Sequence, residues 1–216
     1  REIGGLDTEC IGEDAELVVR LHRRVGDLGE GGKVVFVPEP VAWTEVPADL
    51  RSLARQRRRW HRGLTEVYAR HKSMMLRRRY GVIGMLTLPW FWLFELMAPI
   101  VELTGLVYFV AVLVRLELEH LGIAQADLVD GWVVILLLAC SLSFAIAASV
   151  VALISDELSF GRYSSVRDQL RAVVGVVQEQ VGYRQLTAWW RVQGMVDALR
   201  GSKAVWGDMK RHGFAD

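Results

Sequence analysis

Polar and apolar positions divide the chain into a mixed first part, a basic amphipathic stretch and a long apolar second half. Over Glu13–Val25 the apolar residues recur at helical spacing with arginines on the opposite side, which predicts an amphipathic helix. Lys33–Val37 is a β-prone run stopped by prolines, and it predicts a short strand. Val41–Thr44 predicts a second strand. Helix and strands together predict an α/β fold for residues 1–48.

The next stretch predicts a second helix, with Asp49 as its N-cap. Its apolar stripe consists of Leu50, Leu53, Trp60, Leu64 and Val67. Residues 49–80 carry eleven arginines and lysines against two acids. A basic amphipathic helix of this kind is typical of the surface of an anionic membrane. We therefore expect Arg57 and Arg58 to face lipid headgroups.

The apolar half begins at Tyr80, and its first 35 residues contain only two charged side chains. One membrane span needs about 20 residues, so this stretch is too long for a single crossing. Prolines divide it, which predicts an interfacial helix over about 82–97 and a span over about 99–115. Residues 131–155 carry no charge and predict a second span. The charged segment 164–181 predicts another interfacial helix.

Charge around these spans predicts their orientation. The loop between them holds one arginine and four acids, whereas basic residues crowd both outer flanks. The positive-inside rule therefore places both flanks and the tail in the cytoplasm of a multi-pass protein of the cell membrane. The predicted organisation is a soluble portion over 1–48, a basic interfacial helix over 49–80, a membrane region over 81–182 and a cytoplasmic tail over 183–216.

Bulk composition excludes some classes of protein. The net charge of the 216 residues is only +1, and the basic stretch adjoins the apolar half, so a nucleic-acid partner is not expected. Cys10 and Cys140 give neither a metal-binding spacing nor a disulfide framework. The chain starts as if within a domain, so we expect it to be part of a longer protein.

The basic helix also carries candidate binding chemistry. Helical spacing places Gln56, Arg59, Trp60 and Gly63 on one face. An amide, a guanidinium and an indole, with a small residue leaving room above them, suit a ligand that is anionic and flat, such as a phosphate beside a sugar ring. The alternative is that the arginines only fix topology and Trp60 anchors the helix at the interface.

A second candidate is the pair Glu13 and Asp14. An aspartate at the mouth of an α/β domain can act as a general base that takes a proton from an attacking hydroxyl. The alternative is that acids are common in the first turn of a helix because they complement its dipole. Neither reading is decided by this pair alone.

Taken together, Gly12-Glu13-Asp14 and Gln56-Arg-Arg-Arg59-Trp60 resemble two signatures of the membrane-integrated family 2 glycosyltransferases, which include cellulose, chitin, hyaluronan and poly-N-acetylglucosamine synthases. The first signature is usually Thr-Glu-Asp, so this chain has Gly in place of Thr. The second, Gln-x-x-Arg-Trp, is matched in full. The resemblance extends over the Val35–Pro40 strand, the apolar helices and the tail from Gly182 onward.

The resemblance implies a fold and a set of roles. The fold is the C-terminal part of a GT-A (Rossmann-like) domain, followed by an amphipathic interfacial helix and transmembrane helices. Asp14 would be the general base, Trp60 would stack on the terminal sugar of the acceptor, and Gln56 and Arg59 would line the acceptor and diphosphate site beside Glu13. The activity would be processive, inverting transfer of a sugar from a nucleotide-diphosphosugar to a growing polysaccharide. The membrane helices of this family can form a channel through which the polymer is exported.

The resemblance also implies a UDP-sugar donor, a sugar or polysaccharide acceptor, membrane lipid and a divalent cation, Mg or Mn. The family's metal-binding Asp-x-Asp does not occur before the apolar half, so no metal ligand is assigned in this chain. The donor-binding half is expected upstream of Arg1, and the chain is not expected to catalyse transfer by itself.

Two other functions fit the sequence. One is a non-processive family 2 glycosyltransferase that adds a sugar to a lipid or short acceptor. The other is a non-catalytic membrane scaffold whose basic helix binds lipid. Glu95 and Glu102, seven residues apart, fit either a polar channel or pairing with nearby arginines.

Overall fold

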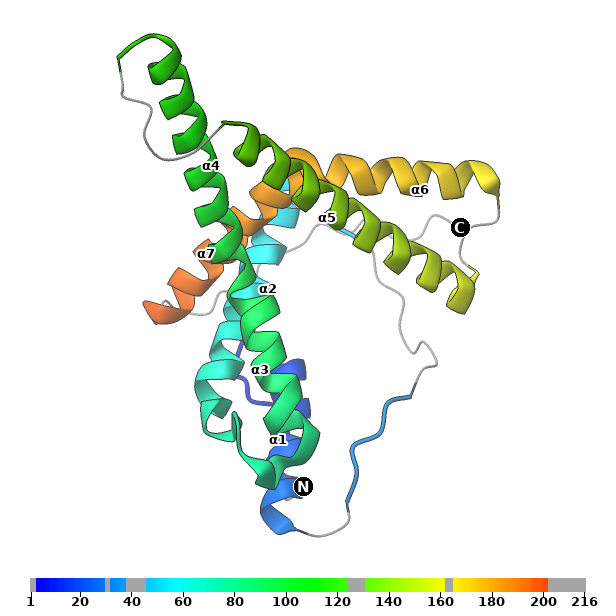
Figure 1. Cartoon of the computed structure of the whole chain (residues 1–216). Helices are drawn as coiled ribbons and strands as arrows, with labels where there is room; N and C mark the ends of the chain where they lie inside the picture. Colours follow the sequence, from blue (N-terminus) through cyan, green and yellow to red (C-terminus); the bar gives the residue numbers. More distant parts are fainter. Residues whose placement is uncertain (1–2, 30–31, 38–45, 124–130, 162–164, 202–216) are drawn as a thin grey trace. The chain divides into compact units, whose positions relative to one another are not determined.

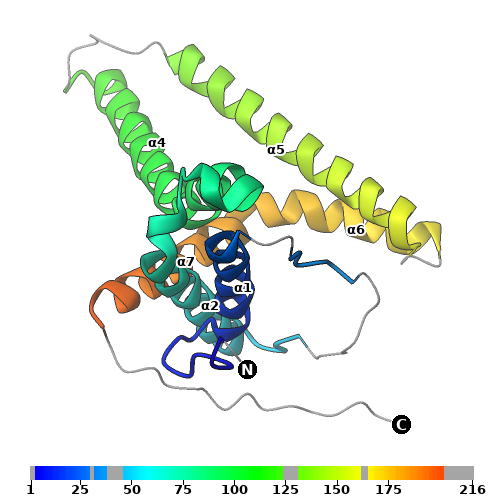
Figure 2. The same ribbon diagram turned by 90° about the horizontal axis from the view of Figure 1, so that it is seen from below.

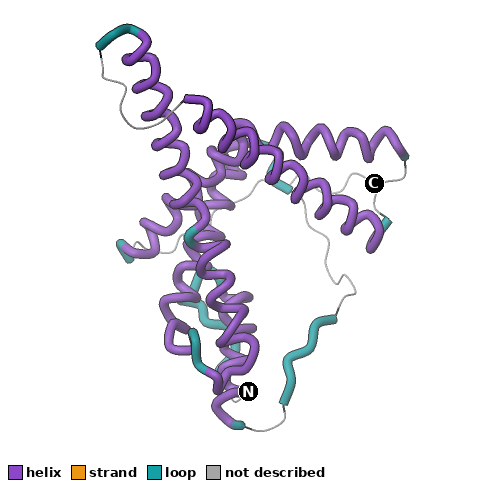
Figure 3. Tube along the Cα trace, viewed as in Figure 1, coloured by secondary structure: helices purple, strands orange, loops and turns teal. Residues whose placement is uncertain are grey.

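A computed structural model describes residues 3–29, 32–37, 46–123, 131–161 and 165–201. In these ranges the regular elements are all helical, and no strand occurs (Figure 3). The chain separates into two compact units (Figure 1), one comprising residues 1–101 with 187–216 and the other residues 102–186. The first unit contains both sequence signatures, so its packing decides how they can act together.

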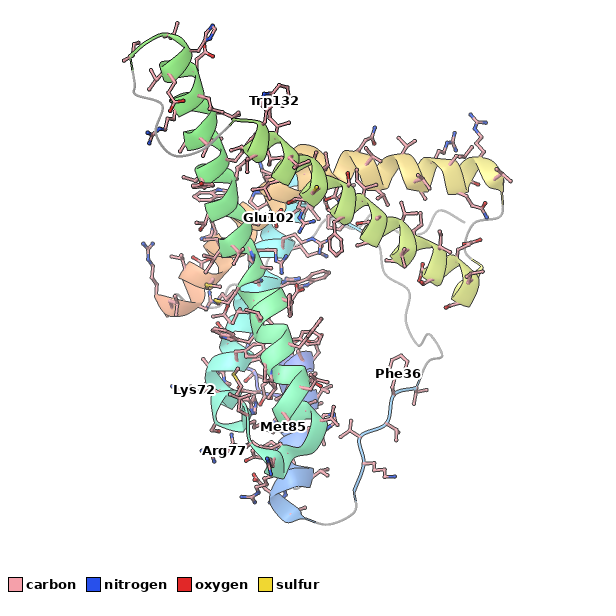
Figure 4. All side chains as sticks on the ribbon, in the orientation of Figure 1. Phe36, Lys72, Arg77, Met85, Glu102 and Trp132 are labelled. Atoms are coloured by element: carbon pink, nitrogen blue, oxygen red, sulfur yellow. The ribbon has the colours of Figure 1, made fainter. Side chains whose placement is uncertain are left out.

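The strand predicted at Lys33–Val37 does not form, which corrects that part of the α/β prediction. The segment is unpaired backbone, and Phe36 is 89 % exposed (Figure 4). A strand needs a neighbouring backbone for its N–H and C=O groups, and the described residues supply none here. The second predicted strand, Val41–Thr44, lies outside the described residues.

The first unit is built on two long helices that lie side by side (Figures 1 and 2). Helix α1 spans Glu13–Leu28 and ends at Gly29 in the left-handed conformation. Helix α2 spans Leu50–His71 and begins as predicted, because the Asp49 side chain accepts a hydrogen bond from the Ser52 N–H at 2.8 Å. This hydrogen bond also lowers the pKa of Asp49.

Short helical turns follow α2 and lead into the apolar half. They are the 3₁₀ turns Lys72–Met74 and Arg78–Tyr80, the π turn Ile83–Thr87, α3 at Leu88–Phe91 and the π turn Trp92–Leu96. Their apolar side chains form one core with α2 and α7, comprising Tyr68, Met74, Tyr80, Leu88, Leu96 and Met195. The segment after Tyr80 is therefore partly packed against α2 and α7.

Helix α7, Arg184–Leu199, packs its second half across α2. The contact is possible because position 194 is glycine: a Cβ there would lie 2.1 Å from the carbonyl oxygen of Arg58. Beside it, the Arg58 guanidinium donates two hydrogen bonds to Asp197, the one from Nη2 to Oδ1 at 2.7 Å. This pairing raises the pKa of Arg58 and lowers that of Asp197. Arg58 thus faces a protein partner, contrary to the expectation that it faces lipid.

The second unit contains two long apolar helices and a shorter helix that carries charges. They are α4 at Ala98–His120, α5 at Gly131–Phe160 and α6 at Val166–Gln178, followed by the π turn Glu179–Tyr183. Two stretches, Ile83–His120 and Gly131–Ser159, are long and apolar enough to cross a membrane, and little of either is buried by the chain itself. At about 1.5 Å per residue, each exceeds the roughly 30 Å of a bilayer core.

We predict that Gly194→Ala destabilises the first unit by about 1–3 kcal/mol, because the added methyl group meets backbone that cannot rotate away. The measurement is the thermal unfolding midpoint of the detergent-solubilised protein, followed by tryptophan fluorescence. Gly175→Ala is the matched control, since a Cβ at this helical position meets no atom within 4 Å. Equal midpoints for the two variants would contradict the close crossing of α7 on α2.

Candidate functional site

The two signatures meet through a backbone contact between two glycines. A Cβ on Gly63 would lie 2.8 Å from the Gly12 nitrogen, and a Cβ on Gly12 would lie 3.1 Å from the Gly63 carbonyl carbon. Gly12 directly precedes Glu13 and Asp14, and Gly63 follows Trp60 by less than one helical turn. The first turn of α1 is therefore held against the turn of α2 that follows the Gln56–Trp60 segment.

This contact corrects one expectation about Gly63. The sequence predicts that its small size leaves room for a ligand, but the backbone of Ile11 and Gly12 fills that room. It also explains why the first signature has Gly where Thr is usual, since a Cβ at position 12 would be tight against α2. Both glycines serve the packing of the site.

The five predicted site residues lie on α1 directly after this contact and on α2 before it. Gln56, Arg59 and Glu13 are half-buried, Asp14 is exposed, and the Trp60 side chain is 54 % exposed. The Asp14 carboxylate accepts a hydrogen bond from the Ala15 N–H at 2.7 Å, as expected of an acid in the first turn of a helix. The face of α2 that carries Gln56, Arg59 and Trp60 is thus accessible beside the start of α1.

Arg57 has a role that the sequence did not predict. Its guanidinium carbon lies 5.2 Å from the centroid of the Trp60 ring, a cation–π arrangement. The residue is half-buried, and its orientation toward lipid stays a prediction. Arg57 lies over one face of the indole, and about half of the Trp60 residue remains exposed.

Glu66 is the site residue that sequence reasoning missed. Its Oε2 accepts a hydrogen bond from the Ile11 N–H at 3.0 Å, which ties α2 to the turn before α1. Its Oε1 accepts a hydrogen bond from Arg62 Nε at 2.8 Å. The available signal was that Glu66 is the one acid in α2, within a strongly basic sequence.

A second polar link between α1 and α2 lies further along both helices. His71 Nε2 and Glu16 Oε1 are 3.0 Å apart, and both side chains are buried. Arg20 adds a contact to Glu16 at 3.1 Å. Together with the glycine contact, this link fixes the spacing of the two helices at two points along their length.

His61 directly follows Trp60 and points into the first unit, where it is buried. Its Nδ1 lies 3.4 Å from Arg191 Nε on α7, and Arg191 Nη2 in turn lies 2.6 Å from Glu95 Oε1. Burial, aided by the charge of Arg191, lowers the pKa of His61 to about 4. The imidazole is therefore neutral near pH 7 and cannot be a cationic partner for a diphosphate.

Both acids of the apolar stretch have arginine partners. Glu95 pairs with Arg191 in the first unit, and Glu102 Oε1 lies 2.7 Å from Arg184 Nε in the second. Arg184 also donates to Gln180, whose amide nitrogen lies 3.4 Å from Ser149 Oγ. Of the two possibilities left by the sequence, the structure shows pairing with arginine.

Comparison with protein families now adds to this geometry. Residues 1–153, about seven-tenths of the chain, match the family described as Glycosyl transferase family group 2. The chain belongs to this family. No curated protein and no solved structure matches it. The matched region of this family 2 glycosyltransferase contains Glu13, Asp14, Gln56, Arg59 and Trp60.

Within the part of this family 2 chain that the structure describes, no three His, Cys, Asp or Glu side chains gather so that they could hold a metal ion. The residues present do not fit the divalent cation implied by the resemblance. The chemistry of the site is therefore derived from its carboxylates, guanidinium, amide and indole alone.

We predict that His61 makes the free energy of unfolding fall by on the order of 3 kcal/mol as the pH is lowered from 6.5 to 4. In this window the unfolded chain binds a proton at His61, whereas the folded protein keeps the imidazole neutral. His61→Gln removes this contribution, so the stability difference between wild type and variant should narrow as the pH falls. Parallel stability curves from chemical unfolding would contradict the buried, neutral His61.

Proposed function

We propose that this chain supplies the acceptor end of a processive, inverting glycosyltransferase at the cytoplasmic face of the cell membrane. Membership of family group 2 supports glycosyl transfer from a nucleotide-sugar to an acceptor. The single observation that carries the assignment of residues is the Gly12–Gly63 contact, because it brings the start of α1 to the Gln56–Trp60 segment.

In the proposed reaction, the Asp14 carboxylate takes the proton from a hydroxyl of the acceptor. The hydroxyl oxygen then forms a bond to the anomeric carbon of the donor sugar, while the bond from that carbon to the diphosphate breaks. The nucleoside diphosphate leaves with the electron pair, and direct displacement inverts the anomeric centre. Asp14 must leave the Ala15 N–H, which its exposure allows.

The other site residues bind and orient. Trp60 stacks on the terminal acceptor sugar with the indole face opposite Arg57. Arg59 and Gln56 contact the diphosphate and the acceptor hydroxyls from the same face of α2, and Glu13 lines the acceptor site. A UDP-sugar donor and a Mg or Mn ion belong to the proposal through the family resemblance, and no residue of this chain is assigned to the ion.

The membrane setting is part of the same proposal. The helices near 99–115 and 131–155 cross the bilayer, supported by the length and apolar composition of Ile83–His120 and Gly131–Ser159. Exposed basic residues around α2 contact anionic headgroups, among them Lys72 and Arg77 (Figure 4). Arg51, Arg55, Arg78 and Arg79 are exposed too. The GT-A domain, the cytoplasmic tail and export of the polymer complete the proposed organisation.

We predict that Asp14→Asn lowers the transfer rate constant of the full-length enzyme by about 10²–10⁴-fold, because the base is lost. Trp60→Ala should lower kcat/KM for the acceptor by about tenfold through lost stacking. The assay measures radiolabelled sugar transferred in membranes. Matched controls are Glu9→Gln, an exposed acid before α1, and Trp189→Ala, a tryptophan 52 % exposed on α7. Wild-type transfer by Asp14→Asn would favour the scaffold function.

A separate measurement tests processivity. We predict that the purified full-length enzyme, given labelled nucleotide-sugar in excess over acceptor, releases long polymer while most acceptor stays unextended. Retention of the terminal sugar on Trp60 between additions is the physical reason. Products one sugar longer than the acceptor would instead establish the non-processive alternative, which acts on a lipid or short acceptor.

A further inference from the structure

Both carboxylate oxygens of Glu66 have partners, and one of these partners lies outside α2. Within the helix, Glu66 contacts Arg62 and, at 4.0 Å, Arg70 Nη1. The bond from Arg62 Nε joins residues four apart on the same helix. The bond from the Ile11 N–H joins segments 55 residues apart in the sequence. The Glu66 side chain is only 14 % exposed, so water competes weakly for it. A charge-assisted hydrogen bond to a backbone amide is among the stronger hydrogen bonds in proteins.

The amide that Glu66 holds belongs to the turn that precedes α1. This turn runs from Asp7 to Gly12, and its Asp7 carboxylate lies 3.2 Å from Arg70 Nε on α2. At its end, the Gly12 backbone rests on Gly63. The glycine contact sets how close the turn can come to α2, but it is a steric limit and does not pull the turn inward. The attraction comes from the Asp7–Arg70 ion pair at the start of the turn and from Glu66 at Ile11, next to α1.

We infer that Glu66 is a positioning residue, which holds the Ile11 amide on α2 and thereby fixes where Asp14 lies relative to α2. Ile11 precedes Asp14 by three residues, and helix α1 begins at Glu13, one residue before Asp14. A displacement of the turn therefore displaces Asp14 by a similar distance. This inference rests on the proposed function, in which Asp14 takes a proton from the acceptor. Misplacement of a catalytic group by about 1 Å can cost about 100-fold in rate.

The test compares Glu66→Gln with Glu66→Leu in the full-length enzyme in membranes. The two side chains have similar size, and both lose the charge that pairs with Arg62. Only glutamine has an oxygen that can accept the Ile11 N–H bond. Asp197→Ala is the control, because it removes an ion pair between α7 and Arg58 of α2 and keeps the hydrogen bond from Ile11 to Glu66. Asp14→Asn is measured in parallel, and Glu66→Ala replaces Glu66→Leu where the leucine variant fails to insert.

We expect Glu66→Leu to lower kcat for transfer by about 10- to 100-fold with the KM for the nucleotide-sugar unchanged. Glu66→Gln should retain kcat to within about threefold, and Asp197→Ala should keep the wild-type kcat even though its unfolding midpoint falls. Hydrogen exchange by mass spectrometry gives a readout independent of activity: amides 8–14 should exchange faster in Glu66→Leu than in Glu66→Gln. A purely stabilising role of Glu66 would change the unfolding midpoint and leave kcat per folded enzyme unaltered.

The outcomes separate this inference from the proposed function. Full activity of Glu66→Leu beside an inactive Asp14→Asn overturns the positioning role alone. Equal exchange of amides 8–14 in the leucine and glutamine variants also overturns it, since the hydrogen bond from Ile11 to residue 66 would then not hold the turn. Full activity of Asp14→Asn overturns the proposed function, and with it the catalytic role of the hydrogen bond between Glu66 and Ile11.

Discussion

The close contact of Gly12 with Gly63 is the constraint on which the site depends. A Cβ at Gly63 would clash with the backbone of Gly12 at 2.8 Å, and a Cβ at Gly12 would be tight against the backbone of Gly63 at 3.1 Å. As a result, the first turn of α1 is placed against α2 less than one turn beyond Trp60. The buried His71–Glu16 pair holds the same two helices further along. The exposed carboxylate of Asp14 and the exposed indole of Trp60 are thereby carried by one rigid pair of helices.

The opposite side of α2 is used for support. Gly194 lets α7 cross α2 closely, Arg58 pairs with Asp197, and His61 is buried beside Arg191. A helix with so many arginines could have presented all of them to lipid or ligand. In this protein the arginines of α2 have different partners. Some pair with neighbouring helices, and Arg57 lies over the ring of Trp60. Arg59 lies on the same face of α2 as Gln56 and Trp60. This variety of partners explains how a very basic helix can be part of a packed unit.

Local signals in the sequence predicted local features well. The Asp49 cap, the two amphipathic helices and the long apolar stretches follow from capping chemistry, periodicity and hydropathy. The family also followed from two short signatures, and the match over residues 1–153 bears it out. The predictions that failed concern contacts with residues far away in the sequence. Gly63 was expected to leave room for a ligand, but that room is filled by a segment 51 residues earlier, and the partner of Arg58 lies 139 residues later. The strand at Lys33–Val37 had the right composition and lacks a pairing backbone among the described residues.

The central claim is that Asp14 and Trp60 contact the same acceptor sugar. The most direct measurement is a cryo-electron microscopy structure of the full-length enzyme with an acceptor oligosaccharide bound. The account predicts that the terminal sugar stacks on the Trp60 face opposite Arg57, with one hydroxyl about 2.6–3.2 Å from the Asp14 carboxylate. An acceptor whose terminal sugar lies away from Trp60, or with Asp14 directed at no sugar hydroxyl, would contradict it.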